Sequence, residues 1–256
     1  MRIARLASLC LIAGTVLVAL AQAPAARAED VAAQDWSFNG PFGTYDRGSL
    51  QRGYQVYKEV CSTCHSMKYL SYRNLEGIGL SEAQVKAIAA GYTVDGDLND
   101  DGSKVLQRNG LPSDRFVSPF PNDKAARASN NGALPPDQSS LVNAREGGSD
   151  YIYAVLTGYV TPPAGFKVSD GMNYNAAFSG HQIAMPKPLS DDQVTYTDGT
   201  KATLPQEAHD VVTFLTWAAN PEMEERKRMG VHVVLFLLIL TGIVYTVKRK
   251  VWADVH

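Results

Sequence analysis

Cys61-Ser62-Thr63-Cys64-His65 is the stretch of this 256-residue chain that decides its fold. Two thiols three positions apart, followed at once by a histidine, form the attachment pattern of a c-type haem. One helical turn brings both cysteines to the same face, and the histidine then presents a nitrogen to the iron. A redox dithiol or half a zinc site explains the pattern less well, because no further cysteine follows. The sequence predicts one covalent haem c on Cys61 and Cys64, with His65 as an axial ligand.

The N-terminal segment predicts export. Residues 1–28 begin with two arginines, continue through an apolar run over residues 6–21, and end in Ala26-Arg27-Ala28. This is the layout of a secretory signal peptide that is cleaved from the mature chain. The third cysteine, Cys10, leaves with it, so the mature chain has no cysteine left for a disulfide.

The C-terminal segment predicts a membrane anchor. Residues 229–247 carry no charge apart from His232 and span about 28 Å as a helix, close to the ~30 Å bilayer core. The run is too apolar on all faces for a core helix. Three basic residues flank it on each side, so the orientation follows from the export signal. We expect an exported haem domain at 29–228, a transmembrane helix at 229–247 and a cytoplasmic tail at 248–256. We therefore expect a single-pass protein of the inner membrane with its haem domain in the periplasm.

Charge in the exported part points to the kind of partner. Residues 29–221 contain 22 acidic and 15 basic side chains. An acidic electron carrier favours a basic protein partner, because complementary fields raise encounter rates. The same surface argues against nucleic acid as a partner.

The pattern of caps, breakers and apolar positions predicts a mainly α fold. We expect a helix capped by Asp46 or Ser49 that leads into the haem motif, and further helices at 82–90, 151–158 and 205–220. Residues 91–140 and 159–192 read as loops. A small β-hairpin is predicted at 194–203 around Asp198-Gly199. This order is similar to a class I mono-haem cytochrome c domain with long loops, in which Gly53 lets the first and last helices cross closely.

The second axial ligand is less certain from the residues. Met185, Met172 and His181 all lie far enough from the haem motif to reach the opposite face. Pro186 restricts the backbone at Met185 and would hold a ligand loop with little entropy loss, which favours this residue. We read Met172 as filler of the core.

The chain resembles the cytochrome c1 family over residues 35–252. The most specific matches are Asn130-Asn131-Gly132-Ala133-Leu134-Pro135-Pro136-Asp137, Asp150-Tyr151-Ile152-Tyr153 and Trp217-Ala218-Ala219. The resemblance implies a haem-carrying, non-catalytic subunit of the bc-type quinol:cytochrome c oxidoreductase. Its partners would be cytochrome b, the Rieske iron–sulfur protein as electron donor and a cytochrome c as acceptor, in a dimeric complex.

The resemblance also assigns residues to the haem. It makes Met185 the sixth ligand, pairs Arg145 with a haem propionate, and places near His65 a carbonyl of the Pro135-Pro136 segment that accepts its ring N–H. The remaining expected pocket residues are Pro136, Tyr151, Val155, Leu156, Phe178 and Ile183.

Two other functions would share the haem motif. One is the haem c subunit of a terminal oxidase, or a solitary anchored shuttle. The other is a haem enzyme or gas sensor with an open iron site, which would bind carbon monoxide readily.

The segment from Asp97 to Gly102 matches half of a calcium loop, but Arg108 stands at its twelfth position, so we expect a solvated acidic loop.

Overall fold

The computed structural model describes residues 31–253. The chain divides into two units, Met1–Val31 and Ala32–His256. The predicted signal peptide at 1–28 and the last residues of the predicted tail lie outside the described residues.

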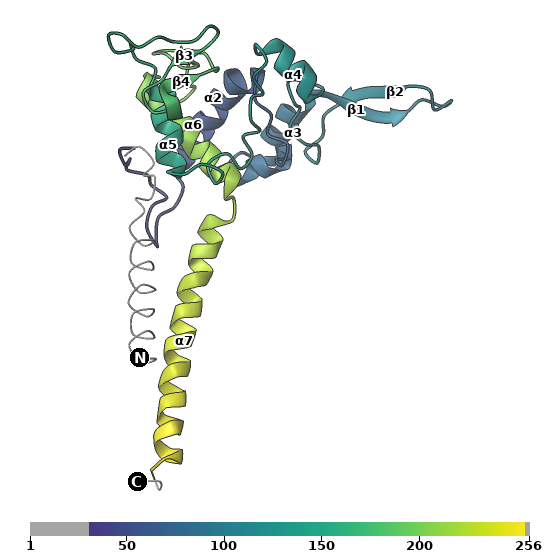
Figure 1. Ribbon diagram of the computed structural model, residues 1–256. Helices are drawn as coiled ribbons and strands as arrows, with labels where there is room; N and C mark the ends of the chain where they lie inside the picture. The colour runs from purple at the N-terminus through teal and green to yellow at the C-terminus, as the bar shows by residue number, and fades with distance from the viewer. Residues whose placement is uncertain (1–30, 254–256) are drawn as a thin grey trace, which may run out of the picture. The chain divides into compact units, whose positions relative to one another are not determined.

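The described chain is mainly helical (Figure 1). Its α-helices are α2 (Arg47–Glu59), α3 (Glu82–Ala90), α4 (Asp123–Ser129), α5 (Gly148–Thr157), α6 (Leu204–Ala219) and α7 (Met223–Val251). Short 3₁₀ helices occupy Cys61–Thr63, Tyr72–Ile78 and Ser179–His181. Two antiparallel pairs of strands complete it, β1 (Thr93–Leu98) with β2 (Val105–Asn109) and β3 (Asn173–Tyr174) with β4 (Gln182–Ile183).

Local capping explains where the predicted helices begin. The side chain of Asp46 accepts a hydrogen bond from the Ser49 amide at the start of α2. Ser81 and Gln84 form a reciprocal capping box at the start of α3, and Thr203 caps α6. These side chains satisfy amides that have no partner inside the helix. The predicted helices 82–90, 151–158 and 205–220 correspond to α3, α5 and α6 and are confirmed to within a few residues.

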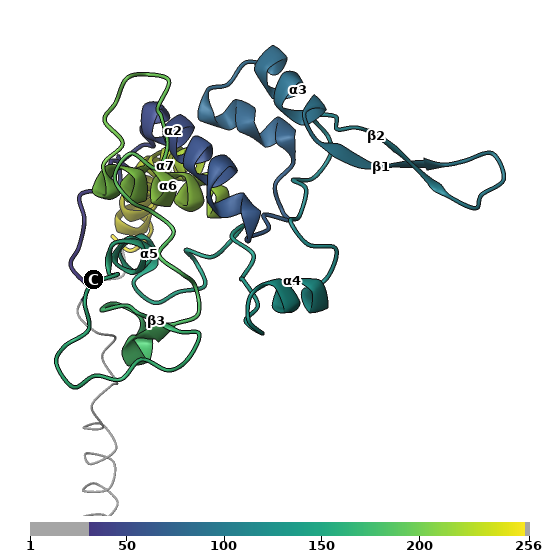
Figure 2. The ribbon, with the colours of Figure 1, turned by 90° about the horizontal axis from the view of Figure 1, so that it is seen from above.

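The core is organised around the crossing of α2 and α6, which lie side by side in Figure 2. A Cβ at Gly53 would lie 2.0 Å from the carbonyl oxygen of Asp210, so only glycine allows this approach. The rings of Tyr54 and Tyr57 pack against Phe214 with centroids 5.6 Å and 5.8 Å apart. The close crossing predicted at Gly53 is confirmed.

The hairpin predicted at 194–203 was wrong. A turn forms one residue earlier than predicted, with Thr197 and Asp198 at its centre and the Gly199 amide donating to the Tyr196 carbonyl at 3.3 Å, but no strands flank it. Side chains from two helices bind backbone groups of this segment instead. The Val194 amide donates to the Glu207 carboxylate in α6, and the Thr195 carbonyl accepts from the Gln55 side chain in α2.

A hairpin does form in a segment that we expected to be loop. β1 and β2 pair at 93–109, and residues 99–104, which include most of the acidic segment from Asp97 to Gly102, form their turn. Within the turn, Asn99 accepts the Lys104 amide through its side chain, and Gly102 adopts a positive φ. Helix α4 is a second element that the loop prediction missed.

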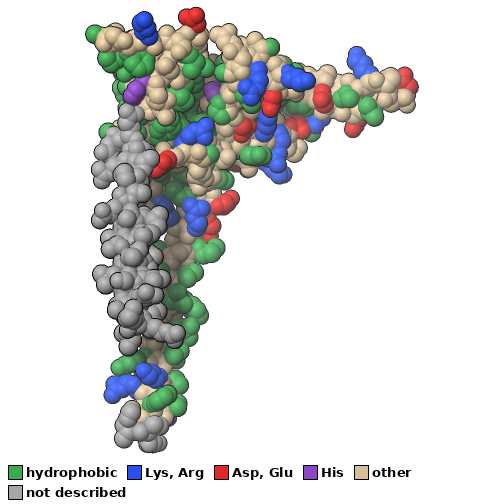
Figure 3. Space-filling model, in the orientation of Figure 1, with side chains coloured by type: hydrophobic (Ala, Val, Ile, Leu, Met, Phe, Trp, Pro, Cys, Tyr) green, Lys and Arg blue, Asp and Glu red, His purple; other side chains and the backbone are tan. Residues whose placement is uncertain are grey.

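Helix α7 is long and apolar enough to cross a membrane, with a mean hydropathy of 2.3 over its most apolar stretch, none of which is buried. Figure 3 shows apolar side chains along it, with charged ones where it begins and near its end. A helix that exposes apolar residues on all sides is stable in lipid rather than in water. By length and composition α7 is a candidate for one membrane span.

Candidate haem site

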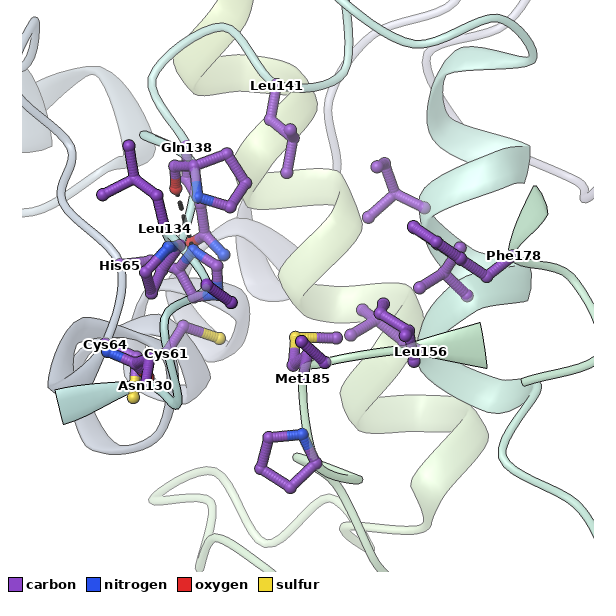
Figure 4. A pocket seen from close by; sticks show the side chains of 18 of the residues that line it. Cys61, Cys64, His65, Asn130, Leu134, Gln138, Leu141, Leu156, Phe178 and Met185 are labelled. Carbon is purple, nitrogen blue, oxygen red and sulfur yellow. Dashed lines mark hydrogen bonds between the residues drawn. The ribbon is translucent and has the colours of Figure 1, made fainter. Parts of the chain in front are cut away.

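A cavity of about 450 Å³ opens beside the haem attachment motif (Figure 4). Its volume is in the usual range for small-molecule and cofactor sites. Every residue that we predicted for the haem site lines it. They are Cys61, Cys64, His65, Pro136, Arg145, Tyr151, Val155, Leu156, Phe178, Ile183 and Met185.

The attachment motif forms a tight turn directly after α2. The amides of Cys64 and His65 both donate to the Cys61 carbonyl, at 3.1 Å and 2.9 Å. Both thiols are free. Burial raises the pKa of the Cys61 thiol to about 12, and the neighbouring Cys64 adds to this.

The His65 side chain is buried, and a backbone carbonyl orients its ring. The carbonyl oxygen of Pro136 lies 2.8 Å from its Nδ1, where the resemblance placed an acceptor. Burial lowers the pKa of His65 despite this contact, which favours the neutral ring. A neutral ring that donates from Nδ1 keeps a lone pair on Nε2, as an iron ligand requires.

Asp137 fixes the carbonyl that orients His65, a role we did not predict. Its carboxylate accepts from the Ser66 hydroxyl at 2.8 Å, the Lys68 amide at 2.9 Å and the Ser139 amide at 2.9 Å. Burial alone would raise the pKa of Asp137, but these hydrogen bonds together lower it. The carboxylate thus ties the Pro135-Pro136 segment to the haem motif. The only sequence signal was its place at the end of a family motif.

Met185 faces the attachment motif across the cavity (Figure 4). Its carbonyl accepts from the Tyr159 hydroxyl at 3.0 Å and from the Asn173 side chain at 3.3 Å. With Pro186 next in the chain, these bonds hold the backbone that carries the thioether.

The other two ligand candidates do not line this cavity. The ring of His181 lies against the Ala176 carbonyl and beside Tyr174. Met172 is exposed, so its reading as core filler was wrong.

The rest of the lining is mostly apolar and comes from α5, α6, the loop around β4 and residues 129–141. Helix α5 contributes Tyr151, Val155 and Leu156, and the loop around β4 contributes Phe178 and Ile183. We did not predict the residues from α6, Val211 and Leu215, although their i, i+4 spacing places them on one face.

Arg145 lies exposed at the cavity and makes no ion pair with any described carboxylate.

Comparison with known proteins identifies the family. The sequence profile of the Cytochrome C1 family matches residues 36–255. The chain belongs to the cytochrome c1 family. "Cytochrome c1" of Rhodospirillum rubrum is 46% identical over 238 residues, covering 87% of each chain. "Cytochrome c1, heme protein, mitochondrial" of Saccharomyces cerevisiae is 48% identical over 221 residues, 86% of this chain and 71% of the relative. "Cytochrome b/c1" of Bradyrhizobium diazoefficiens is 49% identical over 243 residues, and this chain spans about a third (35%) of its length.

The cavity fits the cofactor of the cytochrome c1 family, a covalently bound haem c. Two thiols and an imidazole stand on one wall and a thioether on the other, which is the donor set of a low-spin c-type haem. The Oε1 atom of Gln138, which lines the cavity, is buried and has no hydrogen-bond partner in the described structure. A buried polar atom without a partner at the cavity points to a polar group on a bound molecule.

Proposed function

We propose that this cytochrome c1-type chain accepts one electron from a Rieske iron–sulfur protein and passes it to a cytochrome c. The observation that carries the proposal is the cavity in which Met185 faces the Cys61-to-His65 motif. Two protein ligands leave no open position for substrate, which suits a group that only passes electrons. The chain is then a non-catalytic subunit of the reductase.

Each residue of the site has a proposed role. Cys61 and Cys64 hold the haem through thioether bonds, and His65 and Met185 ligate the iron. When bound, the haem supplies one-electron chemistry, and the protein supplies its orientation and potential. The Pro136 carbonyl sets the orientation of the His65 ring and raises the basicity of Nε2.

Arg145 and the apolar walls complete the proposed site. An exposed guanidinium with no carboxylate partner can neutralise a propionate through paired hydrogen bonds. The side chains of Tyr151, Val155, Leu156, Phe178 and Ile183 exclude water from the cavity. A lower dielectric around the cofactor helps to set its potential.

The proposed setting is a dimeric bc-type complex in the inner membrane, with the haem domain in the periplasm. Helix α7 supplies the single span. A cytochrome b partner is supported by the Bradyrhizobium relative, whose name joins cytochrome b with c1. The excess of acidic residues between 29 and 221 suits a basic donor or acceptor.

The test is to tag the C-terminus, solubilise native membranes in mild detergent, purify, and record reduced-minus-oxidised spectra. Co-purification of b-type haem with the c-type band, together with reduction of the c-type haem by quinol, is the expected result. A single c-type haem with no quinol-dependent reduction would reduce the function to that of a solitary shuttle or an oxidase subunit.

A further inference from the structure

The segment before α2 carries an exposed phenylalanine. Phe42 has 79% of its surface exposed, the highest fraction among the large hydrophobic side chains of the described residues. The aromatic residues just before it are buried, and the rings of Trp36 and Phe38 stack with centroids 5.4 Å apart. Residues 39–44 carry no charge. The chain therefore packs two aromatic rings into the core and leaves the third in an uncharged loop on the outside.

The backbone of this loop holds Phe42 outward. The Asn39 amide donates to the Trp36 carbonyl at 2.9 Å, and the Thr44 amide donates to the Ser37 carbonyl at 3.1 Å. A Cβ at Gly43 would lie 2.0 Å from the Asn39 carbonyl oxygen, so the turn requires glycine there. A loop closed this tightly presents its phenylalanine in a defined place.

The loop is tied to the first turns of α7. The Lys227 ammonium donates to the carbonyls of Phe38 at 2.6 Å and Gly43 at 3.0 Å. Lys227 stands two positions before Met229, where the uncharged run begins, which is about 3 Å along the helix axis. The loop is therefore anchored at the height where the proposed membrane span starts.

A second set of bonds ties the loop's C-terminal side to the same helix. The Tyr45 amide donates to Glu224 at 2.7 Å, and Arg47 pairs with Glu224 at 2.6 Å. These contacts hold the loop against the start of α7. Helix α6 ends at Ala219 and α7 begins at Met223, so only a short link separates the two helices.

We propose that residues 39–44 form a membrane-surface contact, with Phe42 inserted into the headgroup–acyl boundary of the leaflet nearest the haem domain. The occupant is a phospholipid bilayer, because Lys227 ties the loop to α7 two positions before the exposed apolar run begins at Met229. The exposed Arg226 beside it suits lipid phosphates. This second contact limits rotation of the haem domain about the link to α7. The inference rests on the proposed membrane span.

Site-specific photo-crosslinking in native membranes tests this. The full chain, assembled with its partners, carries p-benzoylphenylalanine in place of Phe42, Tyr69 or Leu237. Leu237 lies in the middle of α7, and Tyr69 is the matched control, since it is 70% exposed and contacts Ser139 and Arg115 rather than α7. After irradiation, mass spectrometry of the peptides measures phospholipid adducts. We expect adducts at positions 42 and 237 and several-fold fewer at 69.

The outcomes distinguish the proposed loop contact from the proposed membrane span. Labelling at 237 with none at 42 beyond the Tyr69 level, or only protein cross-links from 42, overturns the loop contact and leaves the span intact. Absence of adducts at 237 overturns the span itself. As a further check, Lys227→Ala should reduce adducts at 42 several-fold, whereas Lys248→Ala at the far end of α7 should leave them unchanged. Equal yields in both variants would contradict the role of the Lys227 tie.

Discussion

Gly53→Ala tests the packing on which the haem cavity depends. The added Cβ would lie 2.0 Å from the carbonyl oxygen and 2.6 Å from the carbonyl carbon of Asp210, and 2.8 Å from Cβ of Phe214. Ordinary contact begins at 3.4 Å, so the two helices would have to separate by more than 1 Å. Since two of these atoms are backbone, no change of rotamer relieves the overlap.

The expected cost follows from this overlap. Overpacking of a core typically destabilises by about 1–3 kcal/mol, and rigid backbone neighbours place this site at or above the upper end. The gain in helix propensity from glycine to alanine offsets about 1 kcal/mol. A net loss of about 2 kcal/mol would lower Tm by roughly 4–8 °C in a domain of this size.

The assay is thermal unfolding of the haem-loaded chain in detergent, followed by far-UV circular dichroism. Gly48→Ala is the matched control in the same helix, because its nearest neighbours are the ends of the Arg52 and Asp46 side chains, both at 3.2 Å. These contacts are about 0.2 Å short of ordinary contact, against 1.4 Å at Gly53, so the control should unfold much nearer the wild-type temperature. Unfolding of Gly53→Ala at the wild-type temperature would refute the reasoning.

Three further variants probe the site and its support. Met185→Leu should let the reduced protein bind carbon monoxide readily, because the iron loses its proposed thioether ligand. Asp137→Asn should lower stability near pH 7 by about 1–2 kcal/mol, since three donors lose a charged acceptor. Hydrogen bonds lower the pKa of Asp137 below 3.8, so its contribution is present above that pH and lost as the pH falls through the lowered pKa. The difference between variant and wild type should therefore shrink in acid. Arg52→Lys should cost about 1–3 kcal/mol, because a lysine cannot bond both oxygens of the fully buried Asp210 carboxylate.

Each of these variants has a control. Met172→Leu, outside the cavity, should leave carbon monoxide binding slight, and ready binding by the unaltered protein would exclude Met185 as a ligand. Asp170→Asn, at an exposed position, should not change stability at any pH; a constant Asp137→Asn difference down to acid pH would contradict the ionisation argument. Arg108→Lys disturbs a similar two-bond pair with Asp114 on the surface, where solvent screening should make the loss of stability much smaller than at Arg52. Equal costs at Arg52 and Arg108 would show that burial is not the cause.

Features that depend on neighbouring residues could be predicted from the sequence. The haem motif is five consecutive residues, and the helix at 82–90 is delimited by Ser81 and Gly91 on either side of it. The apolar length of α7 likewise follows from composition alone. Capping, helical spacing and hydropathy act over a few residues, so they can be read along the chain.

The hairpin shows where local reasoning fails. Asp198-Gly199 is a good turn, yet Glu207 and Gln55 bind the backbone that a strand partner would need. At 93–109 the strands are exposed on nearly every residue, so no apolar alternation marked them. Both outcomes depend on which groups lie near the segment in space.

The cavity depends on tertiary structure in the same way. From the residues, Met185, Met172 and His181 were all possible partners for His65, and the resemblance favoured Met185. Only folding puts Met185, 120 positions along the chain from His65, on the opposite wall of one cavity. The sequence alone determines which residues can carry the haem chemistry. Packing on α6 decides which of them meet, because segments distant in the chain are brought together by burial of their apolar faces.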